Sequence, residues 1–467
     1  MNKQSVYSSL VKNAGYIFFS KLFPALGAVV VLVVYSRYLP STVYGTYQDL
    51  WVKLLLIGTV AYAGLPISII TFSPVAILFF WNHISNRLRW ALLGWCLFWA
   101  ILFGYLSTVS IFLGILLILM YVANAIQEAL LMSAQKMKTL VWINFLYGSY
   151  FILLHLFFLS TFNLESLMRW LALGMLIRSA WLSMVIFQYY KAVEVPKIHD
   201  EDWHKAWRLW LNLGLYDLLQ TMMRYADKFV LGLFLSTSVF AIYFNGSQAA
   251  DIPFLPYFLG AISTSVLLQL SSVDKGHRKA LDIMRNMGIV LADVVFPLFF
   301  FLLFFREELF SVVLSPKYLS SVPVFTVAIF SLPLRAYNYT TLLQHLHRGD
   351  LINRGALIDL SVTLCLVYPC YHVWGLPGVP FSFVLATYVQ VGFYVYHIQR
   401  ILHTSITAFL PLKNWIKKMF VMAILFFSVH YISLTTLHSI SILIVGLVLF
   451  MFTVIVSFFY DRRKLLR

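Results

Sequence analysis

Apolar segments of about 20 residues follow one another along nearly the whole chain, separated by short breaks of charged or turn-forming residues. A helix of about this length is what crosses the hydrocarbon core of a membrane. The composition agrees, because 61% of the residues are hydrophobic and only 11% are charged, against about 25% charged in a soluble domain. These values exclude a soluble enzyme, a disulfide-rich secreted scaffold and a disordered chain. The sequence therefore predicts an all-α polytopic membrane protein.

The breaks divide the chain into about 14 predicted transmembrane helices and leave no room for a soluble domain. The second span is the least regular, because Pro66 and Pro74 interrupt a long apolar run. The predicted spans cover roughly residues 15–36, 45–70, 90–106, 110–133, 139–160, 165–190, 209–235, 239–269, 284–304, 321–344, 355–373, 376–396, 418–434 and 440–460.

Charge alternates from one loop to the next. Loops on the side of the N-terminus hold 24 of the 34 Lys and Arg residues, whereas the opposite loops hold only Arg37, Arg306 and Lys317. Lys418 and Asp461, at the ends of the last two spans, are counted with the first group. Basic loops stay in the cytoplasm, so both termini are predicted to be cytoplasmic. The net charge of +16 then indicates contact with anionic phospholipids and does not point to nucleic acid.

Two short segments resemble each other at an offset of 196 residues. Residues 39–47 read LPSTVYGTY and residues 235–243 read LSTSVFAIY. Each is the predicted turn between the first and second helix of a set, and six spans separate them. An even number of spans gives both copies the same direction through the membrane, as in transporters with parallel repeats. A chance match between two apolar turns is the alternative explanation.

The repeat predicts two parallel six-helix lobes around a central cavity, plus an appended helix pair. Segment 191–208, KAVEVPKIHDEDWHKAWR, is the longest polar stretch and falls between the two copies, so it is predicted to be a cytoplasmic linker that leads into an interfacial helix. The predicted parts are residues 1–190 for the N-terminal lobe, 191–208 for the linker, 209–400 for the C-terminal lobe and 401–467 for the appended pair with a basic tail.

Six short motifs, taken in their order and spacing, resemble polysaccharide flippases of the O-antigen and capsule type within the MATE-like MOP superfamily. The motifs are NAGY at 13–16, RYLPSTVYGTY at 37–47, DKFVLG at 227–232, STSVFAIY at 236–243, SPKY at 315–318 and WGLPG at 374–378. The resemblance covers essentially the whole chain. It implies a transporter without a cofactor, not an enzyme, in the bacterial inner membrane.

The implied cargo is an undecaprenyl-diphosphate-linked oligosaccharide, moved from the inner to the outer leaflet by alternating access for lipopolysaccharide or capsule export. A glycan polymerase and a chain-length regulator are the implied protein partners. A cation-coupled multidrug exporter of the same superfamily is the alternative, although its often cationic cargo would favour fewer intramembrane Arg and Lys. A membrane-embedded glycan polymerase or ligase is disfavoured, because the largest predicted outer loop spans only about residues 306–318.

Basic side chains inside the predicted spans are expensive in a bilayer and mark cavities, substrate paths or buried ion pairs. Arg and Lys in a wet cavity replace part of the hydration of a diphosphate. The predicted diphosphate-binding candidates are Lys21, Lys53, Arg178, Arg224, Lys228 and Arg335. For Lys53 a local pair with Asp49, one helical turn away, is the alternative. For Lys21 the alternative is snorkelling to headgroups.

The acids inside the spans are predicted to line the cavity or to couple transport to H+ or Na+, with the ion left open. They are Asp49, Glu128, Asp217, Asp227, Asp251 and Asp359. Asp217, Arg224 and Lys228 fall on one stripe of the seventh span. Polar contacts between helices are the alternative role for each acid. The sequence holds no metal-binding, nucleotide-binding or nucleophile motif.

Overall fold

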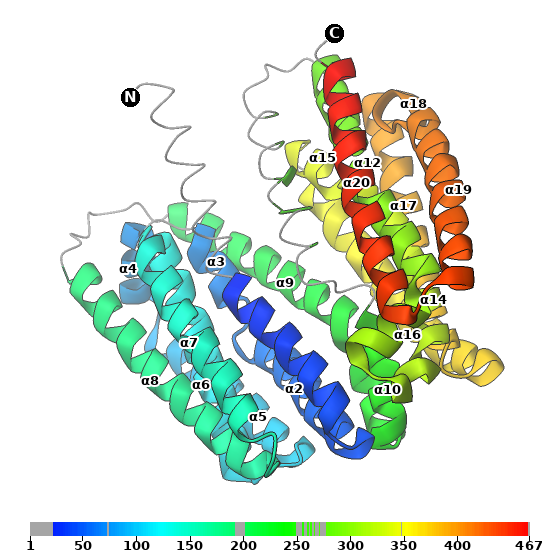
Figure 1. Ribbon diagram of the computed structural model, residues 1–467. Helices are drawn as coiled ribbons and strands as arrows, with labels where there is room; N and C mark the ends of the chain where they lie inside the picture. Colours follow the sequence, from blue (N-terminus) through cyan, green and yellow to red (C-terminus); the bar gives the residue numbers. More distant parts are fainter. Residues whose placement is uncertain are drawn as a thin grey trace. The chain divides into compact units, whose positions relative to one another are not determined.

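A computed structural model describes residues 22–71, 74–191, 201–248, 277–346 and 348–465, with isolated positions between 255 and 270 (Figure 1). All regular structure in these ranges is helical, as predicted. Ten of the described helices are long and apolar enough to cross a membrane, and an eleventh span results if the bent pair of α2 and α3 is counted as one. The chain is therefore a multi-pass membrane protein.

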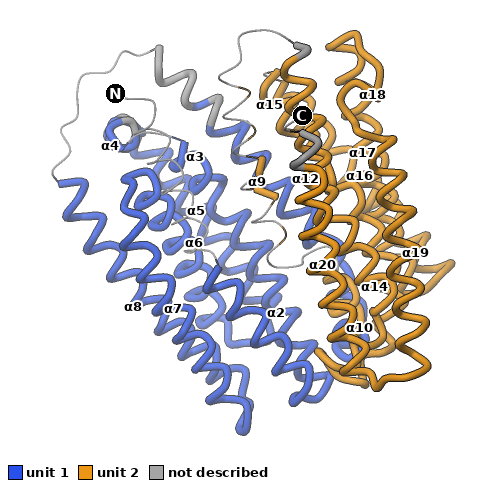
Figure 2. The backbone as a smooth tube through the Cα atoms, turned by 45° about the horizontal axis from the view of Figure 1, so that its top comes forward, with its two compact units in different colours: residues 1–241 blue, residues 242–467 orange. Residues whose placement is uncertain are grey.

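The chain forms two compact units, residues 1–241 and 242–467 (Figure 2). Unit 1 begins, in the described residues, with the apolar helix Leu22–Tyr38. Its further helices are α2 (Ser41–Ala61), α3 (Leu65–Thr71), α4 (Pro74–His83), α5 (Asn86–Leu106), α6 (Ile111–Ser133), α7 (Met137–Phe157), α8 (Leu164–Tyr190) and α9 (Glu201–Phe234). The first residues of α10 (Thr237–Ser247) close the unit.

Unit 2 contains the rest of α10 and a helical body that ends in the predicted appended pair. Its elements are α12 (His277–Phe304), α13 (Arg306–Leu309), the π-helix η2 (Phe310–Leu314), the 3-10 helix η3 (Pro316–Ser321), α14 (Val322–Ala328), the 3-10 helix η4 (Ile329–Ala336), α15 (Tyr339–His345), α16 (Gly349–Trp374), α17 (Gly378–Leu402), α18 (Ile406–Phe409), α19 (Leu412–Thr436) and α20 (Ser439–Leu465).

The helix ends follow from local sequence. Ser85 precedes α5 and its side chain accepts a hydrogen bond from the backbone N–H of Leu88. Asn163 caps α8 in the same way through Ser166. These side chains satisfy backbone donors that a helix start leaves open. Between α16 and α17, Gly375 adopts a φ of 63°, which glycine tolerates because it has no Cβ.

Two predicted spans differ from simple helices. The second is broken after Ala61, and α3 continues at an angle of 57° to α2. The tenth consists of consecutive short α and 3-10 segments between Pro316 and His345, with Pro333 inside η4. Proline removes a backbone donor and clashes with the preceding turn, so Pro333 weakens the α-helical hydrogen-bond pattern at this point.

Helix α9 is continuous from Glu201 to Phe234. It therefore includes the second half of the predicted linker together with the seventh span, while residues 192–200 lie outside the described residues. Within unit 1, α9 packs against both α2 and α3. The lobe boundaries predicted from the repeat stay a prediction.

Candidate functional site

Asp49 and Lys53 of α2 form a buried ion pair. Lys53 Nζ lies 2.6 Å from Asp49 Oδ2, and less than one tenth of either side chain is exposed. The pair spans one helical turn, so the backbone of α2 itself holds both groups in reach of each other. The local pairing predicted as the alternative for Lys53 is thus present.

Arg178 on α8 is held by side chains from α6 and α7. Its guanidinium forms an ion pair with Glu128 and donates hydrogen bonds to Oδ1 of Asn124 (3.0 Å) and of Asn144 (2.6 Å). The ring of Tyr147 lies 4.8 Å from the guanidinium carbon. The structure therefore brings Arg178 and Glu128 together as a structural pair.

The four predicted charges of α9 have different surroundings. Lys228 is buried, lies 3.7 Å from Asp227 Oδ1 and donates a 2.8 Å hydrogen bond to the carbonyl oxygen of Arg224. The side chain of Arg224 is exposed. Asp217 is half-buried and accepts a 2.8 Å hydrogen bond from the hydroxyl of Tyr62. The stripe predicted for this helix therefore divides into a buried pair, an exposed arginine and a carboxylate held by α2.

The break between α2 and α3 lies directly beside Asp217. Gly64 has a φ of 68°, and a Cβ on it would overlap the backbone of Gly214 on α9. The indole N–H of Trp210 donates to the carbonyl oxygen of Ala63, and that of Trp95 donates to Val60, both at 2.9 Å.

Breaks in membrane helices persist where neighbouring groups satisfy the freed backbone, and discontinuous helices mark the binding sites of many transporters. Sequence reasoning missed the indoles and placed the irregularity at the prolines. A signal was present, because Gly64 stands two residues before Pro66.

In unit 2, Asp359 of α16 is buried, and its Oδ2 atom has no hydrogen-bond partner among the described residues. Arg335 is half-buried at the end of the 3-10 segment η4. Lys21 and Asp251, also predicted site residues, lie outside the described residues. A group of three or more metal-ligating side chains is absent from the residues that the structure describes.

Lys418 on α19 bridges two buried acids. It forms an ion pair with Asp293 on α12 and lies 2.5 Å from Asp461 Oδ2 on α20. At the other end of α19, His430 lies 3.1 Å from Glu308 of α13. These contacts fix the appended helix pair to the rest of unit 2. Sequence reasoning counted Lys418 and Asp461 among loop charges, because no local spacing links the three helices; Asp293 precedes Lys418 by 125 residues.

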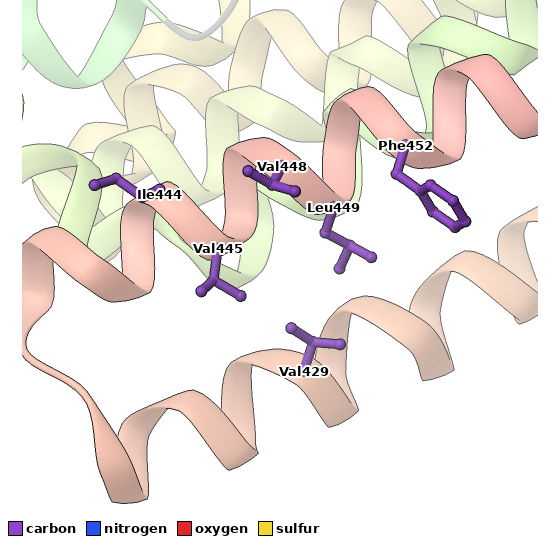
Figure 3. A pocket seen from close by; sticks show the side chains of 6 residues that line it. All are labelled: Val429, Ile444, Val445, Val448, Leu449 and Phe452. Atoms are coloured by element: carbon purple, nitrogen blue, oxygen red, sulfur yellow. The ribbon is translucent and has the colours of Figure 1, made fainter.

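An apolar groove lies between α19 and α20 (Figure 3). The six side chains that line it are all hydrocarbon, and five of them come from α20. They are Val429, Ile444, Val445, Val448, Leu449 and Phe452.

Comparison with known proteins gives both a sequence and a structural match. Residues 104–323 match the family model described as polysaccharide biosynthesis protein. An uncharacterized membrane protein of Methanocaldococcus jannaschii is 24% identical over 252 residues, which cover 51% of this chain and 48% of that protein. The chain thus matches about half the length of this curated relative.

Among solved structures, the lipid II flippase MurJ in an inward closed conformation is similar with a TM-score of 0.66 at 15% identity, over 98% of this chain and 100% of MurJ. An inward-facing multidrug resistance MATE transporter of the MOP superfamily has a TM-score of 0.56 at 13% identity, over 81% of this chain and 94% of that one. These neighbours are transporters and not enzymes. The resemblance predicted from the motifs is confirmed: the chain has the fold of the MurJ and MATE transporters, and it matches the polysaccharide biosynthesis family over residues 104–323.

Proposed function

We propose that the protein is a flippase that moves an undecaprenyl-diphosphate-linked oligosaccharide from the inner to the outer leaflet of the bacterial inner membrane by alternating access, for O-antigen or capsule export. The observation that carries the proposal is the likeness to MurJ over 98% of this chain and 100% of MurJ, in a sequence that matches a polysaccharide biosynthesis family. The MATE structure is matched over a smaller share of this chain, 81%.

The proposed cargo has a charged diphosphate, and the basic residues divide by their access to it. Arg224 is exposed and Arg335 is half-buried, so these two are the proposed first contacts for phosphate oxygens. An arginine fork suits such oxygens because it donates two parallel hydrogen bonds. Lys53, Arg178 and Lys228 are engaged in buried pairs and would bind phosphate only after a change of partner. Lys21 remains a further candidate.

The proposed cargo also has a long branched hydrocarbon chain. The groove between α19 and α20 presents only hydrocarbon side chains, and burial of apolar surface needs no directional partner. We assign the lipid chain of the cargo to this groove. The ion pairs of Lys418 on α19 with Asp461 on α20 and with Asp293 on α12 hold both helices against α12.

For ion coupling, Asp217 and Asp359 are the favoured acids of the predicted set. Asp217 accepts a hydrogen bond from Tyr62 at the break of the second span. A change in the charge of this carboxylate would therefore act at the point where α2 ends and the chain turns into α3. Asp359 is buried with an oxygen atom that lacks a hydrogen-bond partner among the described residues. The MATE neighbours keep a cation-coupled multidrug exporter as the second candidate function.

Deletion of the gene in its native host distinguishes the two functions. A flippase predicts loss of surface glycan and accumulation of lipid-linked intermediates in the inner leaflet, with restoration by the intact gene. Normal surface glycan together with raised sensitivity to cationic dyes would instead identify a drug exporter.

A further inference from the structure

Three charged side chains meet in unit 2, where α12, α19 and α20 lie side by side (Figure 1). Lys418 on α19 forms an ion pair with Asp293 on α12, and its Nζ atom lies 2.5 Å from Oδ2 of Asp461 on α20. The side chains of the two acids are 1% and 3% exposed, and that of Lys418 is 13% exposed. Two buried acids therefore share one base.

This cluster carries an excess negative charge if both acids are ionised. An uncompensated charge is unfavourable inside a protein, and two carboxylates that share a site do not readily ionise together. Other described ionisable groups on α12 and on the elements packed against it are placed differently. Glu308 of α13 pairs with His430 of α19. The remaining groups are the exposed Lys279, Asp282, Arg285, Glu307, Lys413 and Lys417 and the half-buried Arg306 and Arg335.

The hydrogen bonds of Lys418 leave one oxygen atom of Asp293 without a donor. An ammonium group donates three hydrogen bonds. The ammonium of Lys418 contacts Asp293 Oδ1, Asp461 Oδ2 and, at 3.2 Å, the carbonyl oxygen of Ile289. Oδ2 of Asp293 is buried and accepts no hydrogen bond from the described residues.

The carboxyl group of Asp461 lies within hydrogen-bond reach of that of Asp293. Ionised carboxylates can only accept hydrogen bonds, so a hydrogen bond between these two groups requires a proton on one of them. The same proton would remove the excess charge of the cluster.

We propose that Asp293, Asp461 and Lys418 form a proton-binding site, in which one proton between the two carboxyl groups keeps α19 and α20 attached to α12. The protonated acid donates to the ionised one, and the ionised one retains its ion pair with Lys418. Loss of the proton leaves a buried negative charge where three helices meet and weakens their contact. The site is separate from Asp217 and Asp359 and does not depend on the proposed cargo.

The test uses asparagine, which has the shape of a protonated aspartate and is neutral. Asp461→Asn and Asp293→Asn each leave one acid to pair with Lys418, whereas the double variant leaves the ammonium without an anion. Asp282→Asn, at an exposed position of α12, is the matched control. Thermal unfolding and infrared spectra are measured on the purified full chain in lipid nanodiscs without cargo.

At neutral pH, each single asparagine variant should unfold at the temperature of the intact protein or above it. The double variant should unfold at least about 5 °C lower, because its buried ammonium has lost both partners. An aspartate in the unfolded chain is ionised at neutral pH, so the folded state binds one proton more than the unfolded state and its stability falls as pH rises. Between about pH 5 and about pH 8, the unfolding temperature of the intact protein should therefore fall relative to that of Asp461→Asn.

The infrared spectrum reports the proton directly. The intact protein at neutral pH should show the C=O band of a protonated carboxyl group, which both single variants lose and Asp282→Asn keeps. Persistence of the whole band in either single variant would overturn the proposal. A single variant that unfolds at as low a temperature as the double variant, or that fails to accumulate, would also overturn it, because both acids would then be required as ions.

Discussion

The hydroxyl of Tyr62, at the end of α2, donates a 2.8 Å hydrogen bond to Oδ2 of Asp217 on α9. The bond joins a carboxylate in one helix to the point at which another helix breaks. It lies next to the close approach of Gly64 and Gly214. A change in the charge of Asp217 would act directly on this hydrogen bond at the break between α2 and α3.

The first prediction concerns this carboxylate. Asp217→Asn should abolish the dependence of transport on an ion gradient while the protein still inserts, because the amide cannot carry the coupling charge. Tyr62→Phe should weaken the dependence without abolishing it, since only one hydrogen bond is lost. Tyr105→Phe, at an exposed ring, is the control. The test measures the transport rate of each variant with and without an imposed H+ or Na+ gradient. Full ion dependence in Asp217→Asn would remove this residue from the coupling mechanism.

The second prediction concerns the buried pair of Arg178 and Glu128. Arg178→Ala should lower membrane abundance, because removal of one partner from a buried pair costs about 3–5 kcal/mol. Arg178→Ala combined with Glu128→Gln should recover abundance. On the same helix, Arg169 pairs with Glu165 at an exposed site, so Arg169→Ala should cost less than about 1 kcal/mol.

Quantitative immunoblots of membranes measure these three variants. If Arg178→Ala accumulates normally and yet exports no glycan, Arg178 holds phosphate and the structural role assigned to it is wrong.

The third prediction concerns the attachment of the appended helices. Lys418→Met should destabilise unit 2 because it leaves the buried acids Asp293 and Asp461 without their shared cation. A loss of about 3–5 kcal/mol is expected for such a pair. Lys417→Met, at the exposed neighbouring position, should have little effect. Thermal unfolding of the purified variants compares them, and equal unfolding temperatures would show that Lys418 does not hold α19 in place.

The fourth prediction concerns the apolar groove. Val445→Trp should fill the groove between α19 and α20 and reduce export, since this groove is the proposed place of the cargo's lipid chain. Leu447→Trp adds the same ring on an exposed face of α20 outside the groove lining and should export normally. Surface glycan at matched protein levels is the readout. Equal export by both variants would exclude the groove from cargo binding.

Local sequence predicted what depends on local geometry. The pair of Asp49 and Lys53 follows from a spacing of four residues in a helix, and the apolar runs at α5 to α8 and at α16 to α20 follow from length and composition. A count of 14 spans is not confirmed among the described residues, where ten spans and one bent pair pass the test of length and composition.

Long-range contacts escaped prediction because no local pattern encodes them. The break near Gly64 depends on the backbone of Gly214 and on indoles from two other helices. Lys418 was counted with the loops because its two acid partners come from other helices. Whether a charge faces a cavity or a partner helix is decided by packing. The predicted site residues could therefore be separated into members of buried pairs and more accessible residues only from their neighbours in the structure.

The central claim is that the protein carries a lipid-linked diphosphate across a bilayer. The most direct measurement uses proteoliposomes that contain a fluorescent undecaprenyl-diphosphate-linked oligosaccharide and a membrane-impermeant reagent that destroys exposed sugar. With the intact protein, the pool in the inner leaflet should become accessible to the reagent. With Arg224→Ala or Arg335→Ala it should stay protected, and Arg→Lys at either position should restore part of the movement. An inner pool that stays as protected with the intact protein as in empty liposomes would contradict the account.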